Sequence, residues 1–188
     1  MNLESYWLTR PEFDPEPFAK ELEMCLKDAL NTGVVPMLPV PTWVFLSWLN
    51  HTRKNLMHGT GDPSITVFEP RQSNDVGWFG NRKAVYAASD GIWAMFYAIL
   101  NRPAIPMSIH NAAVRLETQP TQDIYFFSVS DSALAQGAFH QGWVYILPRD
   151  GFEQEPPQVR EGIKVQAHHW ASLQAVKPLF RVAVEAAR

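Results

Sequence analysis

Two short steps, far apart along the chain, carry side chains suited to holding a small molecule. His58-Gly59-Thr60 ends one short apolar run, and Val85-Tyr86-Ala87-Ala88 opens another after a long intervening segment. A neutral imidazole offers one hydrogen-bond donor and one acceptor. A glycine lets another group approach the backbone closely, and a tyrosine ring offers flat apolar area. The two steps therefore either build a small-molecule site or pack a fold.

The other histidines and the single cysteine give no metal pattern. No two of the six histidines have the H-E-x-x-H spacing that sets two imidazoles on one helix face. His168 and His169 are adjacent, and strand neighbours point to opposite faces, so at most one of them faces a given site. Cys25 excludes an internal disulfide and a cysteine zinc cluster, and its apolar neighbours favour core packing over a nucleophile. We expect no metal.

Composition and motif searches exclude several common functions. Neither G-x-G-x-x-G nor G-x-x-x-x-G-K-[ST] occurs, and there is no G-x-S-x-G elbow. The net charge is −3 without a basic run, which disfavours a broad nucleic-acid surface. The start MNLESYWLTRPEF lacks a secretory pattern, and the longest apolar segments, Trp43–Leu49 and Ile92–Leu100, are far short of the roughly 20 residues that cross a bilayer. We expect a soluble, cytoplasmic protein with no membrane partner.

The elements that must position the candidate residues begin with helices. A chain of 188 residues with 46% apolar content suits one domain, residues 1–188. Asp14-Pro15-Glu16 is typical of a helix start, and Asn31-Thr32-Gly33 of a helix end. Thr42 is expected to cap a short aromatic helix over Trp43–Asn50. Residues 1–54 are thus predicted to form a helical layer.

Residues 55–188 are predicted to form a β-rich core with one buried helix near 90–101, capped by Ser89-Asp90. The predicted strands are Leu56–Gly59, Ala84–Ala88, Ala112–Glu117, Asp123–Val129, Trp143–Leu147, Val165–Ser172 and Leu179–Val184. Thr60–Lys83 is predicted to be a long loop, of a length that is often functional, and Arg149–Glu161 a solvated loop. Helices followed by strands are typical of an α+β domain.

This layout resembles the ADP-ribosyltransferase fold, in the histidine-tyrosine-glutamate branch shared by diphtheria-type toxins and poly(ADP-ribose) polymerases. In that family the first core strand carries His-Gly-(Ser/Thr). A loop then leads to a strand of the form (Val/Ile)-Tyr-(Phe/Ala)-Ala, which a helix follows. Residues 56–100 match in order, gap and residue types, and beyond them only the strand pattern matches. The resemblance implies N-terminal helices packed on a split, mainly antiparallel β-sheet core of ADP-ribosyltransferase type.

The resemblance implies NAD as the substrate and gives roles to the residues of the two steps. His58 would hydrogen-bond a ribose hydroxyl, and the backbone of Gly59, which Thr60 follows in the motif, would pair with the nicotinamide carboxamide. Tyr86 would stack on the nicotinamide face. The long loop would cover the dinucleotide. A planar arginine side chain could form bidentate hydrogen bonds with the phosphates of the dinucleotide. Polar candidates in the loop, none of them part of a family motif, are Arg71, Asn74 and Arg82.

The third family residue is a glutamate on a later strand, which stabilises the cationic sugar formed as nicotinamide leaves. His169 stands at this position, in His-Trp-Ala-Ser. An imidazole cannot supply a carboxylate's negative charge, and a protonated one would repel the cation. Either the acid comes from elsewhere or transferase activity is weak or lost. The preceding loop holds Glu153, Glu155 and Glu161, and we take Glu155 with His169 as the candidate catalytic residues.

Three hypotheses stay open at this point. The protein is an enzyme that moves ADP-ribose to an unknown acceptor, a non-catalytic module for a nucleotide or a protein on the same fold, or an interaction protein that forms a homo-oligomer through aromatic surface. The alternative for His58 is a strand-end histidine satisfied by a backbone carbonyl, and for Tyr86 a half-buried strand residue. One geometric criterion separates them: the site is real if the His58 and Tyr86 side chains line one cleft, roughly a nicotinamide ring apart, and it is not if they lie on opposite faces of a sheet.

Overall fold

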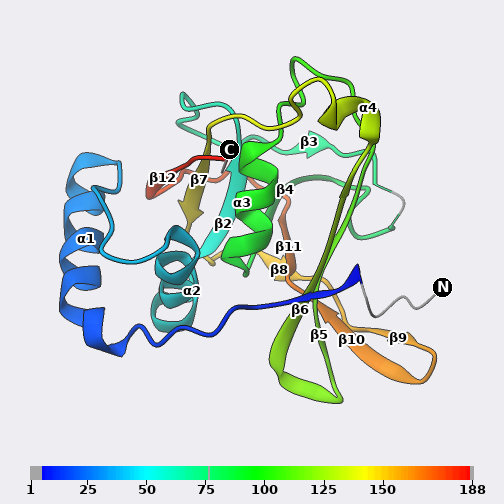
Figure 1. Ribbon diagram of the computed structural model, residues 1–188, viewed down its shortest axis with the longest axis horizontal. Helices are drawn as coiled ribbons and strands as arrows, with labels where there is room; N and C mark the ends of the chain where they lie inside the picture. The colour runs from blue at the N-terminus through cyan, green and yellow to red at the C-terminus, as the bar shows by residue number, and fades with distance from the viewer. Residues whose placement is uncertain (1–5, 76, 187–188) are drawn as a thin grey trace.

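The computed structural model describes residues 6–75 and 77–186, which form helices and two antiparallel sheets (Figure 1). The α+β class predicted above is confirmed. The helices are η2 (Glu16–Phe18), α1 (Ala19–Thr32), α2 (Thr42–Arg53), α3 (Gly91–Ile99) and α4 (Asp131–Leu134). None of the helices in the described part of the chain combines the length and the apolar character that a membrane crossing requires.

The strands divide between the two sheets. The smaller sheet has the order β1 (Leu8–Thr9), β6 (Gln119–Val129), β5 (Ile109–Leu116), β10 (Ile163–Ala167) and β9 (Gln158–Arg160). The larger sheet has the order β12 (Phe180–Val184), β7 (Gly142–Leu147), β2 (Leu56–Thr60), β4 (Lys83–Ala88), β11 (His169–Ser172) and β8 (Glu153–Gln154), and β3 (Arg71–Gln72) also pairs with β4. The β-rich core is therefore split in two, as predicted.

Local sequence explains where the helices begin and end. Asp14 accepts a hydrogen bond from the Glu16 N–H at the predicted start. Gly33 ends α1 in the left-handed region, with φ 80°, and donates to the carbonyl of Ala29. Asp90 caps α3 as predicted, since its side chain accepts from the Trp93 N–H at 2.8 Å. The predicted cap at Thr42 is wrong by one residue, because Pro41 holds that position and Thr42 is already helical.

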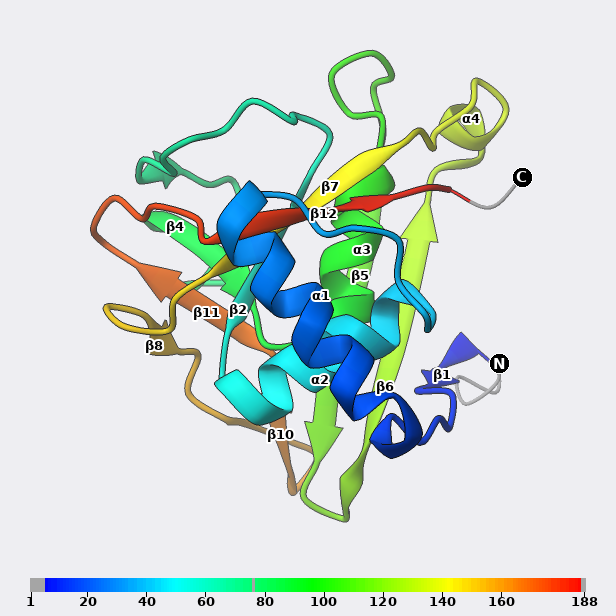
Figure 2. The same ribbon diagram turned by 90° about the vertical axis from the view of Figure 1, so that its left-hand side faces the viewer.

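The main core lies between the helices and one face of the larger sheet. Figure 2 shows α1 and α2 in front of that sheet, and α3 crosses β2 and β7. The fully buried members of this core include Leu22, Phe45, Leu46, Leu49, Met57, Val144 and Ile146. The opposite face is covered in part by the segment after β2, and its buried residues include Leu56, Phe68, Val85, Tyr145 and Trp170.

The predicted strand Val165–Ser172 is wrong, because it consists of two strands in different sheets. β10 belongs to the smaller sheet and β11 to the larger one. Between them the backbone of His168 donates to Ala113 in β5 and accepts from Ser89 beside β4. His168 is thus the point at which the chain passes from one sheet to the other. The short strands β1, β3, β8 and β9 were not predicted.

Candidate functional site

The His-Gly-Thr and Val-Tyr-Ala-Ala steps of the sequence meet where β2 and β4 separate. β2 pairs with β4 only at Met57 and Ala88, whereas His58, Gly59 and Thr60 pair with β7 alone. Continuing the register would set Gly59 opposite Tyr86, but no strand pairing forms there. Instead the His58 Nδ1 lies 2.7 Å from the Tyr86 carbonyl oxygen, and Tyr86 is half-buried. These are the contacts expected from the alternative interpretation, in which His58 is a strand-end histidine satisfied by a backbone carbonyl. An imidazole therefore bridges a gap in the sheet that a backbone ladder would otherwise close.

The prediction that the His58 and Tyr86 side chains clamp one ring in a single cleft is wrong. Met57 and Ala88 are directly opposite, so alternation sets His58 on the face of Ala87 and Tyr86 on the other face. The His58 ring lies against Phe68, with centroids 4.6 Å apart, whereas the Tyr86 ring lies against His169. A ligand that touches both side chains has to lie across the gap rather than between two rings.

His58 is held in a defined protonation state. Burial lowers its pKa below the usual value, the hydrogen bond to the Tyr86 carbonyl opposes this, and the charge of Arg71 lowers the pKa further. A carbonyl only accepts, so the neutral ring carries its proton on Nδ1 and donates it to Tyr86. The Nε2 is then an acceptor, and among the described residues it has no hydrogen-bond partner.

Packing against α3 explains why residue 59 is a glycine, and the sequence did not reveal this. A Cβ built on Gly59 would lie 1.9 Å from the Ala94 carbonyl oxygen and 2.7 Å from the Ala98 nitrogen, both in the α3 backbone. In the same way, a Cβ built on Gly142, on the neighbouring β7, would lie 1.7 Å from the Ala98 carbonyl oxygen. On this face the backbone of α3, and not a ligand, comes close to Gly59. The carboxamide role predicted for Gly59 would have to use its backbone at the gap.

The other predicted binding residues lie along the long segment between β2 and β4. Thr60 ends β2 and accepts a hydrogen bond from the Asp62 N–H through Oγ1, at 3.3 Å. Arg71 is exposed on β3, opposite Ala84, and is near enough to His58 to affect its pKa. Asn74 is exposed. The segment is anchored rather than free, because Phe68 exchanges backbone hydrogen bonds with Val176.

Tyr86 and His169 form the centre of an aromatic cluster on the other face. Their rings stack with centroids 5.1 Å apart and an interplanar angle of 28°. Phe79 and Trp93 meet the imidazole edge-on, at 5.3 and 5.6 Å. The Tyr86 hydroxyl accepts from the Arg82 N–H at 2.8 Å and lies 3.1 Å from the Phe79 carbonyl oxygen, to which it donates. One face of the Tyr86 ring is therefore already in contact with His169.

Of the three candidate carboxylates, the structure brings Glu155 to His169. The Glu155 Oε2 lies 3.0 Å from the His169 Nδ1, and the two side chains are 13% and 17% exposed. The hydrogen bond with His169 lowers the Glu155 pKa and outweighs the opposing effect of burial. The Glu155 N–H donates to the His169 carbonyl, and the Gln158 amide donates to Glu155 Oε1 at 2.8 Å.

The two other carboxylates are not part of this pair. Glu153 forms an ion pair with Arg82, whose guanidinium also lies over the Phe79 ring at 4.2 Å. Glu161 is exposed, in a left-handed turn conformation with φ 50°. Glu155 is therefore the only one of the three candidates next to His169. Its role in catalysis stays a prediction.

Sequence reasoning missed a buried ionic network at the junction of the two sheets. Asp123 receives a bidentate hydrogen bond from Arg115, at 2.8 and 2.9 Å, and the His168 Nε2 lies 2.8 Å from it. Arg10 lies 2.6 Å from both Asp123 and Asp90. The one sequence signal was an aspartate at the head of an apolar strand, Asp123-Ile-Tyr-Phe-Phe.

This network is chemically unlike an open metal site. Asp90, Asp123 and His168 offer ligand atoms within 4.8 Å of one another. Two guanidinium groups, however, already lie against these carboxylates, and the Tyr125 hydroxyl donates to Asp90 at 2.8 Å. The negative charge that a cation would need is thus balanced by arginine. The group ties the segment before α1, the cap of α3 and both sheets together.

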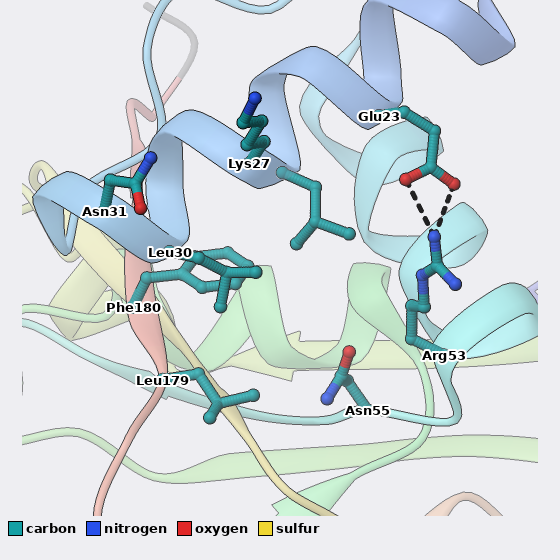
Figure 3. A pocket seen from close by; sticks show the side chains of 9 residues that line it. Glu23, Lys27, Leu30, Asn31, Arg53, Asn55, Leu179 and Phe180 are labelled. Atoms are coloured by element: carbon teal, nitrogen blue, oxygen red, sulfur yellow. Dashed lines mark hydrogen bonds and ion pairs between the residues drawn. The ribbon is translucent and has the colours of Figure 1, made fainter.

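Two hollows stand out on the described surface, and neither is lined by His58, Tyr86 or His169. The larger, of about 460 Å³, lies between α1, the end of α2 and β12 (Figure 3). Leu26, Leu30 and Phe180 make its wall apolar, and the ion pair of Arg53 with Glu23 crosses its rim. The second lies beside Trp43 and Tyr125. Neither gathers the groups that the candidate chemistry needs.

Comparisons with protein-family models, with curated proteins and with solved structures found no match for this chain. The residues that suggest a function are His58, which bridges the gap between β2 and β4, and the pair formed by His169 and Glu155.

Proposed function

We propose that this protein binds NAD at the gap between β2 and β4 and acts as an ADP-ribosyltransferase-like enzyme toward an unidentified acceptor. The observation that carries the proposal is the His58 imidazole, fixed through Nδ1 to the Tyr86 carbonyl at 2.7 Å with Nε2 unpaired among the described residues. The His-Gly and Val-Tyr strands, which the resemblance puts together, are neighbours in the sheet and separate at these residues.

The chemistry of the gap suits a ribose. Because burial lowers the pKa of His58, the ring is neutral near pH 7 and its Nε2 accepts a hydrogen bond from a hydroxyl donor. Beyond Met57 the β4-facing edge of β2 has no strand partner, which leaves backbone groups for a carboxamide. A ligand in this position would contact His58 and the unpaired backbone edge of β2. The Tyr86 and His169 rings lie on the other face of the sheet, and a ligand would reach them only through the gap.

Charge near the gap suits the diphosphate of a dinucleotide. Arg71 is exposed on β3, and its charge reaches His58. Thr60 lies at the end of β2 beside the anchored segment. An arginine fork forms bidentate bonds with phosphate oxygens, so we assign Arg71 to the diphosphate.

A second candidate function is favoured by the stacking of His169 on Tyr86. This imidazole covers one face of the ring that would otherwise stack on nicotinamide. The resemblance to the family also aligns His169 with the position of the glutamate. On that basis the protein is a non-catalytic module that binds a nucleotide without cleaving it. The two functions differ in turnover and not in the location of the ligand.

The test is calorimetry with NAD combined with measurement of nicotinamide release. We expect binding that falls at least tenfold in His58→Ala and more weakly in Arg71→Ala. The matched controls are His51→Ala and Arg53→Ala, both at exposed positions on α2. Nicotinamide release supports the enzyme, and binding without release supports the module. Absence of NAD binding, or equal affinities in His58→Ala and His51→Ala, would end the proposal.

A further inference from the structure

The pair formed by His169 and Glu155 has a geometry that a lone carboxylate does not have. The Glu155 carboxylate lies 3.0 Å from His169 Nδ1, and no hydrogen bond engages Nε2 among the described residues. A carboxylate at Nδ1 fixes the tautomer, because the proton stays between the two groups and Nε2 keeps its lone pair. An oriented imidazole of this kind is a general base.

The surroundings hold this pair in place from several elements. Glu155 is bound by the Gln158 amide at 2.8 Å and, through its backbone, by His169 itself at 2.9 Å. Tyr86 stacks on the imidazole from β4, and Trp93 meets its edge from α3. Rigid positioning by packing and by further hydrogen bonds is what a reacting group requires.

Few other charges face His169. Glu155 is in direct contact with it and the Tyr86 ring is stacked on it, while Phe79 and Trp93 are uncharged. Phe79 is also in contact with the guanidinium of Arg82, which forms an ion pair with Glu153. His168, the chain neighbour, points away to Asp123.

We propose that His169, oriented by Glu155, is the general base of the reaction and that the acceptor is a hydroxyl group, with water as its simplest member. This inference rests on the proposed NAD site. The bond between nicotinamide and ribose C1′ breaks, and its electron pair leaves with nicotinamide. The hydroxyl oxygen forms the new bond to C1′, and its proton passes to His169 Nε2. Glu155 stabilises the resulting imidazolium and is a positioning residue.

The identity of the acceptor follows from what the pair does. An imidazole does not supply the negative charge that would stabilise the sugar cation directly, so its contribution lies in removing a proton from the nucleophile. Hydroxyl groups gain most from such a base, because they are weak nucleophiles until they lose their proton. A carboxylate acceptor is already ionised and needs no base.

The experiment uses the full chain with NAD, and with methanol as a trapping alcohol. We expect nicotinamide release with formation of ADP-ribose, and of its O-methyl glycoside when methanol is added. His169→Gln and Glu155→Gln should each lower kcat by roughly 10²-fold or more, within the range of general-base catalysis, with little change in NAD affinity. The matched controls are His110→Gln on β5 and Glu117→Gln in the turn after it, both at exposed positions, which should keep the wild-type kcat.

A pH profile separates a catalytic from a merely structural pair. A carboxylate is a weaker base than an imidazole, so the acid limb of the profile depends on which of the two groups is at position 169. His169→Glu should therefore retain turnover and move the acid limb of the profile to lower pH. Thermal unfolding of each variant shows whether it is folded.

The outcomes separate the two proposals. If the folded variants His169→Gln and Glu155→Gln turn over NAD with unchanged kcat, the catalytic role of the His169–Glu155 pair is wrong, whereas the proposed NAD site is not affected. Binding without cleavage by the wild-type chain overturns the dyad in favour of the non-catalytic module. Failure to bind NAD overturns both.

Discussion

The substitution Gly59→Ala tests whether this glycine is required by packing or by a ligand. The new Cβ would lie 1.9 Å from the Ala94 carbonyl oxygen, whereas ordinary contacts begin at 3.4 Å, so α3 would have to move by about 1.5 Å. Both atoms that it meets belong to the helix backbone and cannot rotate away. The helix is fixed on its other sides, because Ala94 and Ala98 are 2% and 0% exposed.

The size of the expected loss in the free energy of unfolding follows from these contacts. Overpacking of a tight core costs about 1–3 kcal/mol and sometimes more, and a clash with backbone belongs at the upper end. Alanine in a strand recovers about 0.5–1 kcal/mol of the backbone entropy that glycine loses. We expect a net loss of about 2 kcal/mol in the free energy of unfolding, or roughly 4–8 °C in Tm for a domain of this size.

The assay is urea unfolding followed by tryptophan fluorescence, with Gly77→Ala as the control. A Cβ at Gly77 would meet only the Asp75 side chain, at 3.6 Å, so this variant should stay within about 0.5 kcal/mol of the wild type. A Gly59→Ala protein as stable as Gly77→Ala would refute the packing argument. If such a protein also lost NAD affinity, Gly59 would belong to the ligand site alone.

Three further predictions concern the buried groups. Burial alone raises the pKa of Asp123, but the hydrogen bond and charge of His168 and the charges of Arg10 and Arg115 outweigh it and hold the pKa at about 2. At pH values above its unfolded pKa this group should therefore contribute about 2 kcal/mol to the free energy of unfolding, and this contribution is lost as the pH falls from about 5 to about 2. In Asp123→Asn the free energy of unfolding should fall less steeply over this pH range. Arg10→Ala should lower stability by about 1–3 kcal/mol in urea, because it leaves the Asp123 and Asp90 carboxylates less paired; a change below 0.5 kcal/mol would show that the network does not depend on it. Burial raises the pKa of the Cys25 thiol, and the residue is only 8% exposed, so a thiol reagent should label the native protein more slowly than the urea-unfolded chain; equal labelling rates would contradict its place in the core.

The helices could be predicted because their local signals are strong. Asp90 caps α3 and Gly33 ends α1 at the residues the sequence indicated. The strands β2, β4 and β7 follow from apolar runs bounded by turn residues. The two-residue strands could not be predicted, since Leu8–Thr9 and Arg71–Gln72 form through tertiary pairing and carry no periodic pattern.

The sequence singled out His58, Tyr86 and Glu155, whose functional roles stay predictions, and the structure puts each in a specific polar contact. The arrangement of these side chains could not be predicted. The sequence did not show on which face each side chain lies, because that depends on the register of β2 against β4. It also treated Val165–Ser172 as one strand, since the buried pairing of His168 with Asp123 involves residues far apart in sequence.

The central claim is that His58 Nε2 accepts a hydrogen bond from a hydroxyl of NAD at the gap. The most direct measurement is NMR of ¹⁵N-labelled histidine during a titration with NAD, with His58→Gln used to assign the resonances. We predict that the Nε2 resonance of His58 changes saturably while its Nδ1 resonance stays that of a protonated nitrogen. A saturable change at other histidines with His58 unaffected, or no change at all, would contradict the account.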